Sequence, residues 1–205
     1  MLIEMKLNAF LDRTASSDPV PGGGSISALA AASAAGLVEM VANLTASGKG
    51  SDAIKTEMKE ISKKAAEFRV KLSECIDRDS KAYNQVISSY KMPKNNEAEA
   101  TTRTRAIQAA LKHAAEVPLQ VASETLKLMT LAEIVLKKGN PNAVTDVLVA
   151  VMMARTATLG ALFNVKINLR SITDSSYVSK LSAQVRETEV TALEKEKDLL
   201  ALVNL

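Results

Sequence analysis

Residues 25–47 read SISALAAASAAGLVEMVANLTAS, a run in which eight of 23 residues are alanine. Alanine is the strongest helix former, and no proline interrupts the run. Ser33 and Gly36 add further small side chains, so the expected helix is thin. A thin helix lets its neighbours approach closely. The run therefore predicts a helix packed deeply among other helices.

On both sides of this run, apolar residues recur at helical spacing between a few breakers rich in glycine, proline and serine. The helix over 142–165 has no broad polar face and should be central. No strand-like alternation persists, and no internal repeat is present. We therefore expect a single all-α domain over residues 1–205, an up-and-down bundle of about six long helices. The expected helices cover about 5–15, 25–45, 51–90, 96–138 with a kink at Pro118, 142–165 and 173–203.

Composition excludes several classes of protein. The chain of 205 residues has 26 basic and 23 acidic residues, interspersed, so its net charge of +3 is no nucleic-acid signature. One cysteine, Cys75, excludes an internal disulfide, and one histidine, His113, makes a zinc site improbable, so we expect no metal. The start of the chain does not read as a secretion signal, and the apolar stretches are shorter than the roughly 20 residues that cross a bilayer. We expect a cytoplasmic protein with neither a nucleic-acid nor a membrane partner.

The segment Pro21-Gly22-Gly23-Gly24-Ser25 directly precedes the alanine-rich run. Three glycines before a helix can leave several backbone N–H groups pointing into one space, beside the positive end of the helix dipole. Such a segment is a ready site for an anion. It is neither a Walker A loop nor a dinucleotide fingerprint. The alternative is a flexible turn without a ligand.

Two carboxylates in the helix expected over 51–90 differ in their surroundings. Asp77 and Asp79 are two residues apart, so they point roughly 200° away from each other and cannot form a catalytic dyad. Asp77, four residues before Lys81, is assigned to the solvated face. Asp79 falls on an apolar stripe, where lost hydration should raise its pKa and suit it to proton transfer. Pairing with an arginine, or capping another helix, is the alternative for Asp79.

Polar residues also mark the helix expected over 142–165. Asp146 and Asn164 are 18 residues apart and share a face, with small residues between them, and Asn168 lies near that face. This stripe fits either the lining of a groove or a tight helix–helix contact in which the polar groups satisfy backbone atoms. Seams of small residues can also bury one face against a second copy, so we expect a homodimer.

Several motifs along nearly the whole chain can be compared with known families. The most specific are Pro19-Val20-Pro21-Gly22-Gly23-Gly24-Ser25 and Phe163-Asn164-Val165-Lys166-Ile167-Asn168-Leu169, taken together at this separation. The others are Asp77-x-Asp79 with Ala82-Tyr83, Met92-Pro93-Lys94, Val117-Pro118-Leu119, Gly139-Asn140 and Asp146. In these motifs the chain resembles the cyclodeaminase/cyclohydrolase family. That family includes the cyclodeaminase domain of formiminotransferase-cyclodeaminase and standalone bacterial methenyltetrahydrofolate cyclohydrolases.

The resemblance implies an all-helical, dimeric enzyme that binds tetrahydrofolate carrying a one-carbon unit, with the acid at Asp79 catalytic. Two reactions fit. A cyclohydrolase hydrolyses 5,10-methenyltetrahydrofolate to 10-formyltetrahydrofolate, and a cyclodeaminase converts 5-formiminotetrahydrofolate to the methenyl compound with release of ammonia. The sequence shows no resemblance to a formiminotransferase, so the cyclohydrolase reaction is expected first. A folate-binding helical dimer without catalysis is the remaining alternative.

The expected substrate-binding residues are candidates chosen from the patterns described above. The segment Gly22, Gly23, Gly24 and Ser25, together with Asp146, Asn164 and Asn168, is expected to hold the pterin or the folate carboxylates. Lys94 is expected to meet the negative glutamate tail. Both reactions are hydrolytic or eliminative, so no cofactor beyond the tetrahydrofolate substrate and no metal are expected.

Overall fold

The computed structural model describes residues 1–204, which contain six α-helices, two short 3-10 helices and no β-strand. The all-α class and the six helices predicted from the sequence are confirmed. The helices are α1 (Leu7–Thr14), α2 (Gly23–Ser47), α3 (Asp52–Tyr90), α4 (Glu97–Lys138), α5 (Val144–Leu169) and α6 (Ser175–Leu200). The 3-10 helices are η1 (Leu2–Glu4) and η2 (Pro141–Ala143).

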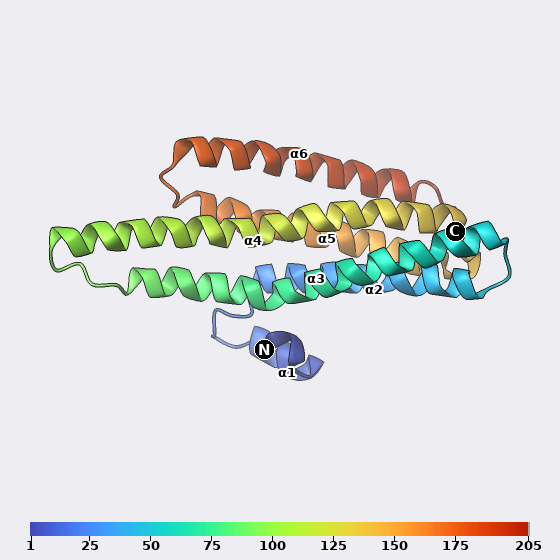
Figure 1. Cartoon of the computed structure of the whole chain (residues 1–205), viewed down its shortest axis with the longest axis horizontal. Helices are drawn as coiled ribbons and strands as arrows, with labels where there is room; N and C mark the ends of the chain where they lie inside the picture. Colours follow the sequence, from blue (N-terminus) through green and yellow to red (C-terminus); the bar gives the residue numbers. More distant parts are fainter. Residues whose placement is uncertain (205) are drawn as a thin grey trace.

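Four helices, α2 to α5, form an up-and-down bundle in which each packs against its neighbours in the chain, and α5 also packs against α2. In Figure 1, α3 and α4 lie in front of α2 and α5, α6 lies along one edge, and α1 lies on the opposite edge, where its Phe10 is buried in the core. The connection through η1 holds the start of the chain against α3. The long, nearly antiparallel helices leave short connections, as the sequence breakers predict.

The alanine-rich helix lies in the core, as its sequence predicts. Most alanines of α2 are fully buried, as are the alanines on one side of α5. These helices approach so closely that a Cβ at Gly160 of α5 would lie 2.5 Å from the Ser27 hydroxyl of α2. Only small side chains permit this separation, because a larger one would overlap the facing helix. The tight-contact interpretation of the small-residue stripe therefore holds for this part of α5.

Side chains cap three of the helices as the sequence predicts or allows. Ser51 accepts a hydrogen bond from the N–H of Ile54 at the start of α3, and Asn96 accepts one from Glu99 at the start of α4. Asp174 caps α6 in the same way. α2 has no side-chain cap, because Gly22 occupies the N-cap position. Its first-turn N–H groups therefore lie at a positive helix end that the N-cap residue itself leaves open.

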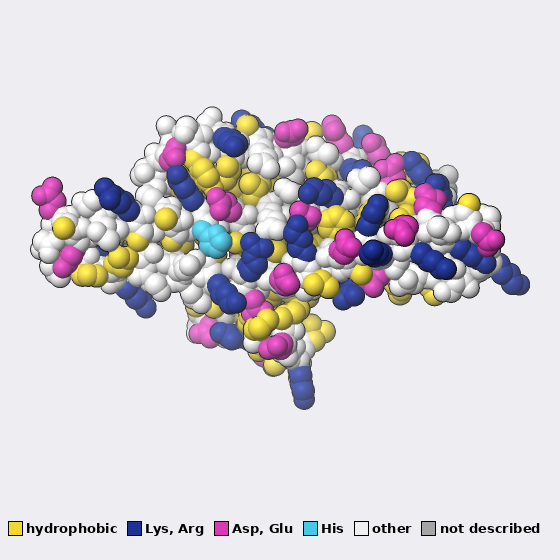
Figure 2. All heavy atoms as spheres, viewed as in Figure 1, with side chains coloured by type: hydrophobic (Ala, Val, Ile, Leu, Met, Phe, Trp, Pro, Cys, Tyr) yellow, Lys and Arg dark blue, Asp and Glu magenta, His cyan; other side chains and the backbone are white. Residues whose placement is uncertain are grey.

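The surface of the bundle is mixed. Figure 2 shows positive and negative side chains interspersed over α3, α4 and α6, with apolar side chains gathered on the protruding N-terminal segment. By length and composition alone, α2 and the segment 141–169 could each cross a membrane. Of their most apolar windows, 56% and 44% respectively are buried inside the bundle, which is also typical of core helices in a folded domain.

Candidate active site

Asp79 lies on α3 where it passes the beginning of α2. Its Oδ2 atom is 3.0 Å from the Ser25 hydroxyl, which can donate to it. The carboxyl is half-buried, so it is partly shielded from water without being closed off. Asp79 thus lies on the side of α3 that faces α2, as its place on the apolar stripe predicts. Its carboxyl contacts the first turn of α2.

Gly24 makes this meeting possible. A Cβ built at Gly24 would overlap the Asp79 carboxyl group, with its Oδ2 only 2.7 Å away. Any other residue would push the carboxyl away from the helix, because real Cβ contacts are never this short. The need for glycine at this position is therefore steric, and it arises from the carboxylate rather than from a loop conformation.

Burial dominates the electrostatics of Asp79. Removal from water disfavours the charged form and raises the pKa of the Asp79 carboxyl above its ordinary value. Hydrogen bonds from the hydroxyl and the backbone of Ser25 oppose this rise without cancelling it. No charged neighbour in the described chain contributes to the shift. A carboxyl in this state can exchange a proton closer to neutral pH than an exposed aspartate can.

The glycine segment differs in part from the sequence prediction. Gly23, Gly24 and Ser25 form the first turn of α2, and only Gly22 precedes the helix. The expectation that the helix begins only after the glycines, at about residue 25, was therefore wrong. The helix starts earlier because the small residues let Asp79 and α5 pack directly on its first turn. The predicted positive helix end is present, but it lies at Gly23, two residues earlier in the sequence than expected.

Asn164 approaches the same turn from α5. Its amide nitrogen would lie 3.5 Å from a Cβ at Gly23, and it donates to the carbonyl of Gly160 at 2.9 Å. Asn168, one turn further along, donates to the carbonyls of Ala114 on α4 and of Asn164. Both amides are half-buried. Their nitrogens are thus committed to backbone carbonyls, and their side-chain oxygens are available as acceptors.

Ser25 differs from the predicted role. Its side chain is fully buried, and its hydroxyl lies within hydrogen-bonding distance of α3 atoms only. A ligand on the surface does not reach this hydroxyl. The prediction that Ser25 binds substrate directly is corrected: Ser25 contacts the Asp79 carboxyl instead.

Two predicted residues lie away from this place. Asp146 is in the first turn of α5, and the 18 residues to Asn164 correspond to about 27 Å along the helix. The two share a face, but within one chain they cannot line one small site, and a substrate-binding role for Asp146 stays a prediction. Lys94 is exposed in the connection between α3 and α4. The helix from Asp79 to Tyr90 alone spans about 16 Å, so Lys94 could meet only a distant part of a ligand.

Asp77 contradicts the sequence interpretation. It is buried, and it accepts hydrogen bonds from the N–H of Leu2 at 2.7 Å and of Ile3 at 3.3 Å. It therefore caps η1 rather than lying on the solvated face beside Lys81. The local spacing to Lys81 suggested an exposed pair, but the actual partner is at the start of the chain, 75 residues away.

Sequence reasoning also missed Ser80, whose hydroxyl lies 3.2 Å from that of Ser25. Gly160, by contrast, belongs to the small-residue stripe expected between Asp146 and Asn164, and it permits the contact between α5 and α2. Ser80 carries no such signal, because a buried serine resembles an exposed one in sequence.

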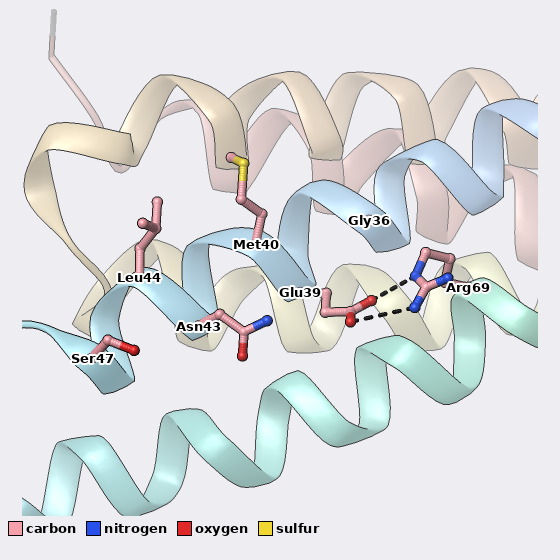
Figure 3. A pocket seen from close by; sticks show the side chains of 7 residues that line it. All are labelled: Gly36, Glu39, Met40, Asn43, Leu44, Ser47 and Arg69. Atoms are coloured by element: carbon pink, nitrogen blue, oxygen red, sulfur yellow. Dashed lines mark hydrogen bonds and ion pairs between the residues drawn. The ribbon is translucent and has the colours of Figure 1, made fainter.

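Other surface grooves lie away from Asp79. One of about 530 Å³ runs between α2 and α3, where Glu39 and Arg69 are paired at 2.7 Å (Figure 3). Another, of about 510 Å³, is lined by Arg78, Lys81 and His113 among others. In residues 1–204, no group of three His, Cys, Asp or Glu side chains is placed to hold a metal ion.

Comparisons with known proteins identify the family of this chain. The family model described as formiminotransferase-cyclodeaminase matches residues 6–187. A methenyltetrahydrofolate cyclohydrolase of Methylorubrum extorquens is 37% identical over 174 residues, covering 85% of this chain and 84% of that protein. The formimidoyltransferase-cyclodeaminase of Rattus norvegicus is 30% identical over 202 residues, covering 98% of this chain but 37% of that protein.

A solved structure is also similar over almost the full length. The crystal structure of formiminotetrahydrofolate cyclodeaminase from Thermotoga maritima matches with a TM-score of 0.86 and 30% sequence identity, covering 97% of this chain and 96% of that one. The similarity therefore covers the fold of nearly the whole chain. The chain belongs to the formiminotransferase-cyclodeaminase family.

Proposed function

We propose that this chain is an enzyme of folate one-carbon chemistry that hydrolyses 5,10-methenyltetrahydrofolate to 10-formyltetrahydrofolate, with Asp79 as the acid/base. The observation that carries the proposal is the half-buried Asp79 carboxyl, seated on the first turn of α2 with a raised pKa. The similarity to a protein named methenyltetrahydrofolate cyclohydrolase, at 37% identity over most of both chains, supports the substrate class.

In this reaction, ionised Asp79 takes a proton from water as the water oxygen bonds to the amidinium carbon between N5 and N10. The product of that step is a tetrahedral carbon. The bond to N5 then breaks and N5 receives the proton held by Asp79. The hydroxyl on the carbon releases its own proton to water and becomes the carbonyl of the formyl group, which stays on N10. One carboxyl of raised pKa can serve both steps, because it gives up its proton as readily as it takes it.

The groups around Asp79 suggest how the substrate is held. The oxygens of Asn164 and Asn168 can accept hydrogen bonds from a pterin ring, and the positive N-terminal end of α2 favours a negative group. Gly23 is exposed at this turn, so a ligand can approach the backbone closely. We propose that Lys94 attracts the far, negatively charged tail. No metal and no cofactor beyond the folate are part of this proposal, and we expect the protein in the cytoplasm.

The second candidate is the cyclodeaminase reaction, in which N10 attacks the 5-formimino carbon and ammonia leaves. The similarity to proteins named formimidoyltransferase-cyclodeaminase and formiminotetrahydrofolate cyclodeaminase favours it. Both reactions pass through a tetrahedral carbon between N5 and N10, so the same carboxyl could serve either.

One experiment separates these candidates. Purified protein is mixed with 5,10-methenyltetrahydrofolate, and separately with 5-formiminotetrahydrofolate, and the absorbance of the methenyl compound is followed. Accelerated loss in the first mixture alone supports the cyclohydrolase. Appearance in the second, with release of ammonia, supports the cyclodeaminase. If the absorbance changes in neither mixture but tetrahydrofolate raises the melting temperature, the protein binds folate without catalysing either reaction.

We also propose that the protein is a homodimer that pairs through the outer side of α2 and α5. That side exposes Val149, Met152, Phe163 and Ile167 of α5, with exposed fractions of 47–61%. The basic groups of α5 are turned away: Arg155 pairs with Glu196 of α6, and Lys166 pairs with Glu189 of the same helix. On α2, Met40 and Leu44 are also exposed, and Figure 3 shows both projecting from one side of that helix.

The size of this side fits a stable dimer. α5 has 26 residues and is about 39 Å long, and two packed helices are about 20 Å wide. The resulting face, about 800 Å², is close to what one partner contributes to a standard interface.

Light scattering should give a dimer for the wild type and a monomer for Met152→Glu. The control is Val70→Glu, a similarly exposed change on α3, which should stay dimeric. A monomeric wild type would contradict the proposal.

A further inference from the structure

The hydroxyl of Ser25 has more neighbours than it can serve at once. Its Oγ atom lies 2.9 Å from the carbonyl oxygen of Ile76, 3.0 Å from Oδ2 of Asp79 and 3.2 Å from the Ser80 hydroxyl. A serine hydroxyl has one hydrogen to donate and two lone pairs that accept. Ser25 is fully buried, so no water competes for these positions. The arrangement of hydrogens must therefore depend on which neighbours can donate.

The protonation state of Asp79 decides this arrangement. An ionised carboxylate only accepts, so Ser25 must donate to Asp79, and the Ser80 hydroxyl can donate to Ser25 in turn. A protonated carboxyl can donate to Ser25 Oγ, which frees the Ser25 hydrogen for the Ile76 carbonyl. That carbonyl is not orphaned in the first case, because a helix carbonyl also accepts the N–H four residues later. Both states are fully hydrogen-bonded.

We propose that Ser25 is a positioning residue whose hydroxyl turns between the Asp79 carboxylate and the Ile76 carbonyl as Asp79 loses and gains its proton. The Ser25 hydrogen stays on Oγ throughout, and the only proton transferred is the one on Asp79. The carboxyl thus keeps its place against Gly24 in both halves of a reaction that needs it first as a base and then as an acid. The inference rests on the proposed acid/base role of Asp79.

No charged side chain disturbs this exchange. α2 has no titratable residue before Glu39, and Asp77 is turned to the N–H groups of Leu2 and Ile3. No charged group contributes to the shift in the pKa of Asp79, and several charged groups on the elements packed around it have other partners in the described chain. These pairs are Glu39 with Arg69, Glu116 with Tyr177, Glu124 with Lys71, Lys166 with Glu189, and Arg78 with Gln120. The hydrogen bonds of Ser25 are therefore the local means of adjusting the Asp79 carboxyl.

The test measures the Asp79 carboxyl directly. Carbon-13 NMR titration of aspartate carboxyls is recorded on the full chain for the wild type and Ser25→Ala, with Asp79→Asn identifying the signal. Ser33→Ala is the matched control, because Ser33 lies on the same helix and donates only to the Leu29 carbonyl of its own helix. The pH dependence of kcat for methenyl hydrolysis is measured on the same proteins.

We expect Ser25→Ala to move the Asp79 titration to higher pH, because the ionised form loses its hydroxyl donor, and to move the rising limb of kcat in the same direction. Ser33→Ala should change neither. An unchanged or lower Asp79 titration in Ser25→Ala would overturn the inference, whatever happens to stability. If Ser25→Ala does not fold, Ser80→Ala should give a smaller upward shift, and no shift there would overturn it. If Ser25→Ala shifts the Asp79 titration but the wild type hydrolyses no methenyl compound, the proposed function is contradicted and the inference about Ser25 is not.

Discussion

Two carboxylates of α3, Asp77 and Asp79, lie two residues apart and each meets the beginning of another helix. Asp77 accepts two backbone hydrogen bonds from the start of η1 and is buried. Asp79 meets the start of α2, where a serine hydroxyl lies against one of its oxygens and the carboxyl remains half-exposed. The same side chain thus has two different surroundings within one turn of a helix.

The difference lies in how completely each carboxylate is satisfied. Two N–H donors hold Asp77 in place, and its oxygens are occupied by the protein. At Asp79, burial outweighs the hydrogen bonds and raises the pKa of the carboxyl, while one side remains open. A saturated carboxylate contributes to structure, and an incompletely satisfied one is available for chemistry. The predictions below test whether the two roles separate in this way.

The largest effect is expected for Asp79→Asn. Asparagine keeps the shape and can accept the Ser25 hydroxyl, but it cannot exchange a proton. Turnover of 5,10-methenyltetrahydrofolate should fall by about 10²–10⁴-fold, the usual contribution of a general acid/base. Binding of tetrahydrofolate, followed by calorimetry, should remain measurable. Asp77→Asn is the matched control and should retain most of its activity. Equal losses in both variants would contradict the separate roles given to the two carboxylates.

Gly24→Ala should give the next largest effect. In a helix, alanine is favoured over glycine by about 1 kcal/mol, so the change would stabilise the protein if there were space. The added methyl group overlaps the Asp79 carboxyl, so we expect a lower melting temperature and a loss of turnover of at least about tenfold. Gly36→Ala, on the same helix, meets only the Arg69 side chain at 3.7 Å and should be neutral or stabilising. Similar outcomes for the two variants would show that Asp79 does not need this close approach.

Asp77→Ala should affect stability and not chemistry. Two N–H groups, one of them buried, lose their acceptor, and each unsatisfied group costs about 1–3 kcal/mol. Urea unfolding should show a loss in this range, and amide exchange at Leu2 and Ile3 should speed up. The exposed Asp12→Ala serves as control and should stay within about 0.5 kcal/mol of the wild type. A large loss of turnover at unchanged stability would reverse the roles given to the two carboxylates.

Much of the fold could be predicted from the sequence because its signals are local. Alanine content, helical spacing and the caps at Ser51 and Asn96 place the long helices within a few residues. The start of α2 could not be placed in this way. Glycine usually favours a loop, and only the facing Asp79 and Asn164 explain why Gly23 and Gly24 are helical.

The site shows the same limit. Asp79 could be singled out because a charged residue on an apolar stripe is a local anomaly. The place of Asp77 could not, because its partners, Leu2 and Ile3, lie at the start of the chain and are ordinary apolar residues. Helical register correctly placed Asp146 and Asn164 on one face of α5. A shared face does not make two residues close, however, and these two lie about 27 Å apart along the helix.

The smallest effect concerns stability and pH. Since the pKa of Asp79 is raised in the folded protein, the folded state binds more protons than the unfolded state between the unfolded value, about 3.9, and the folded value. The contribution of Asp79 to stability therefore falls as pH rises through this window and stays low above it. Asp79→Asn removes the charge, so at neutral pH it should unfold at slightly higher urea concentration than the wild type. The gap should widen from about pH 4 upward and then level off, whereas Asp77→Asn should be less stable than the wild type throughout. A gap that narrows with rising pH would mean that the folded protein favours ionised Asp79, and the two carboxylates would then differ in position only.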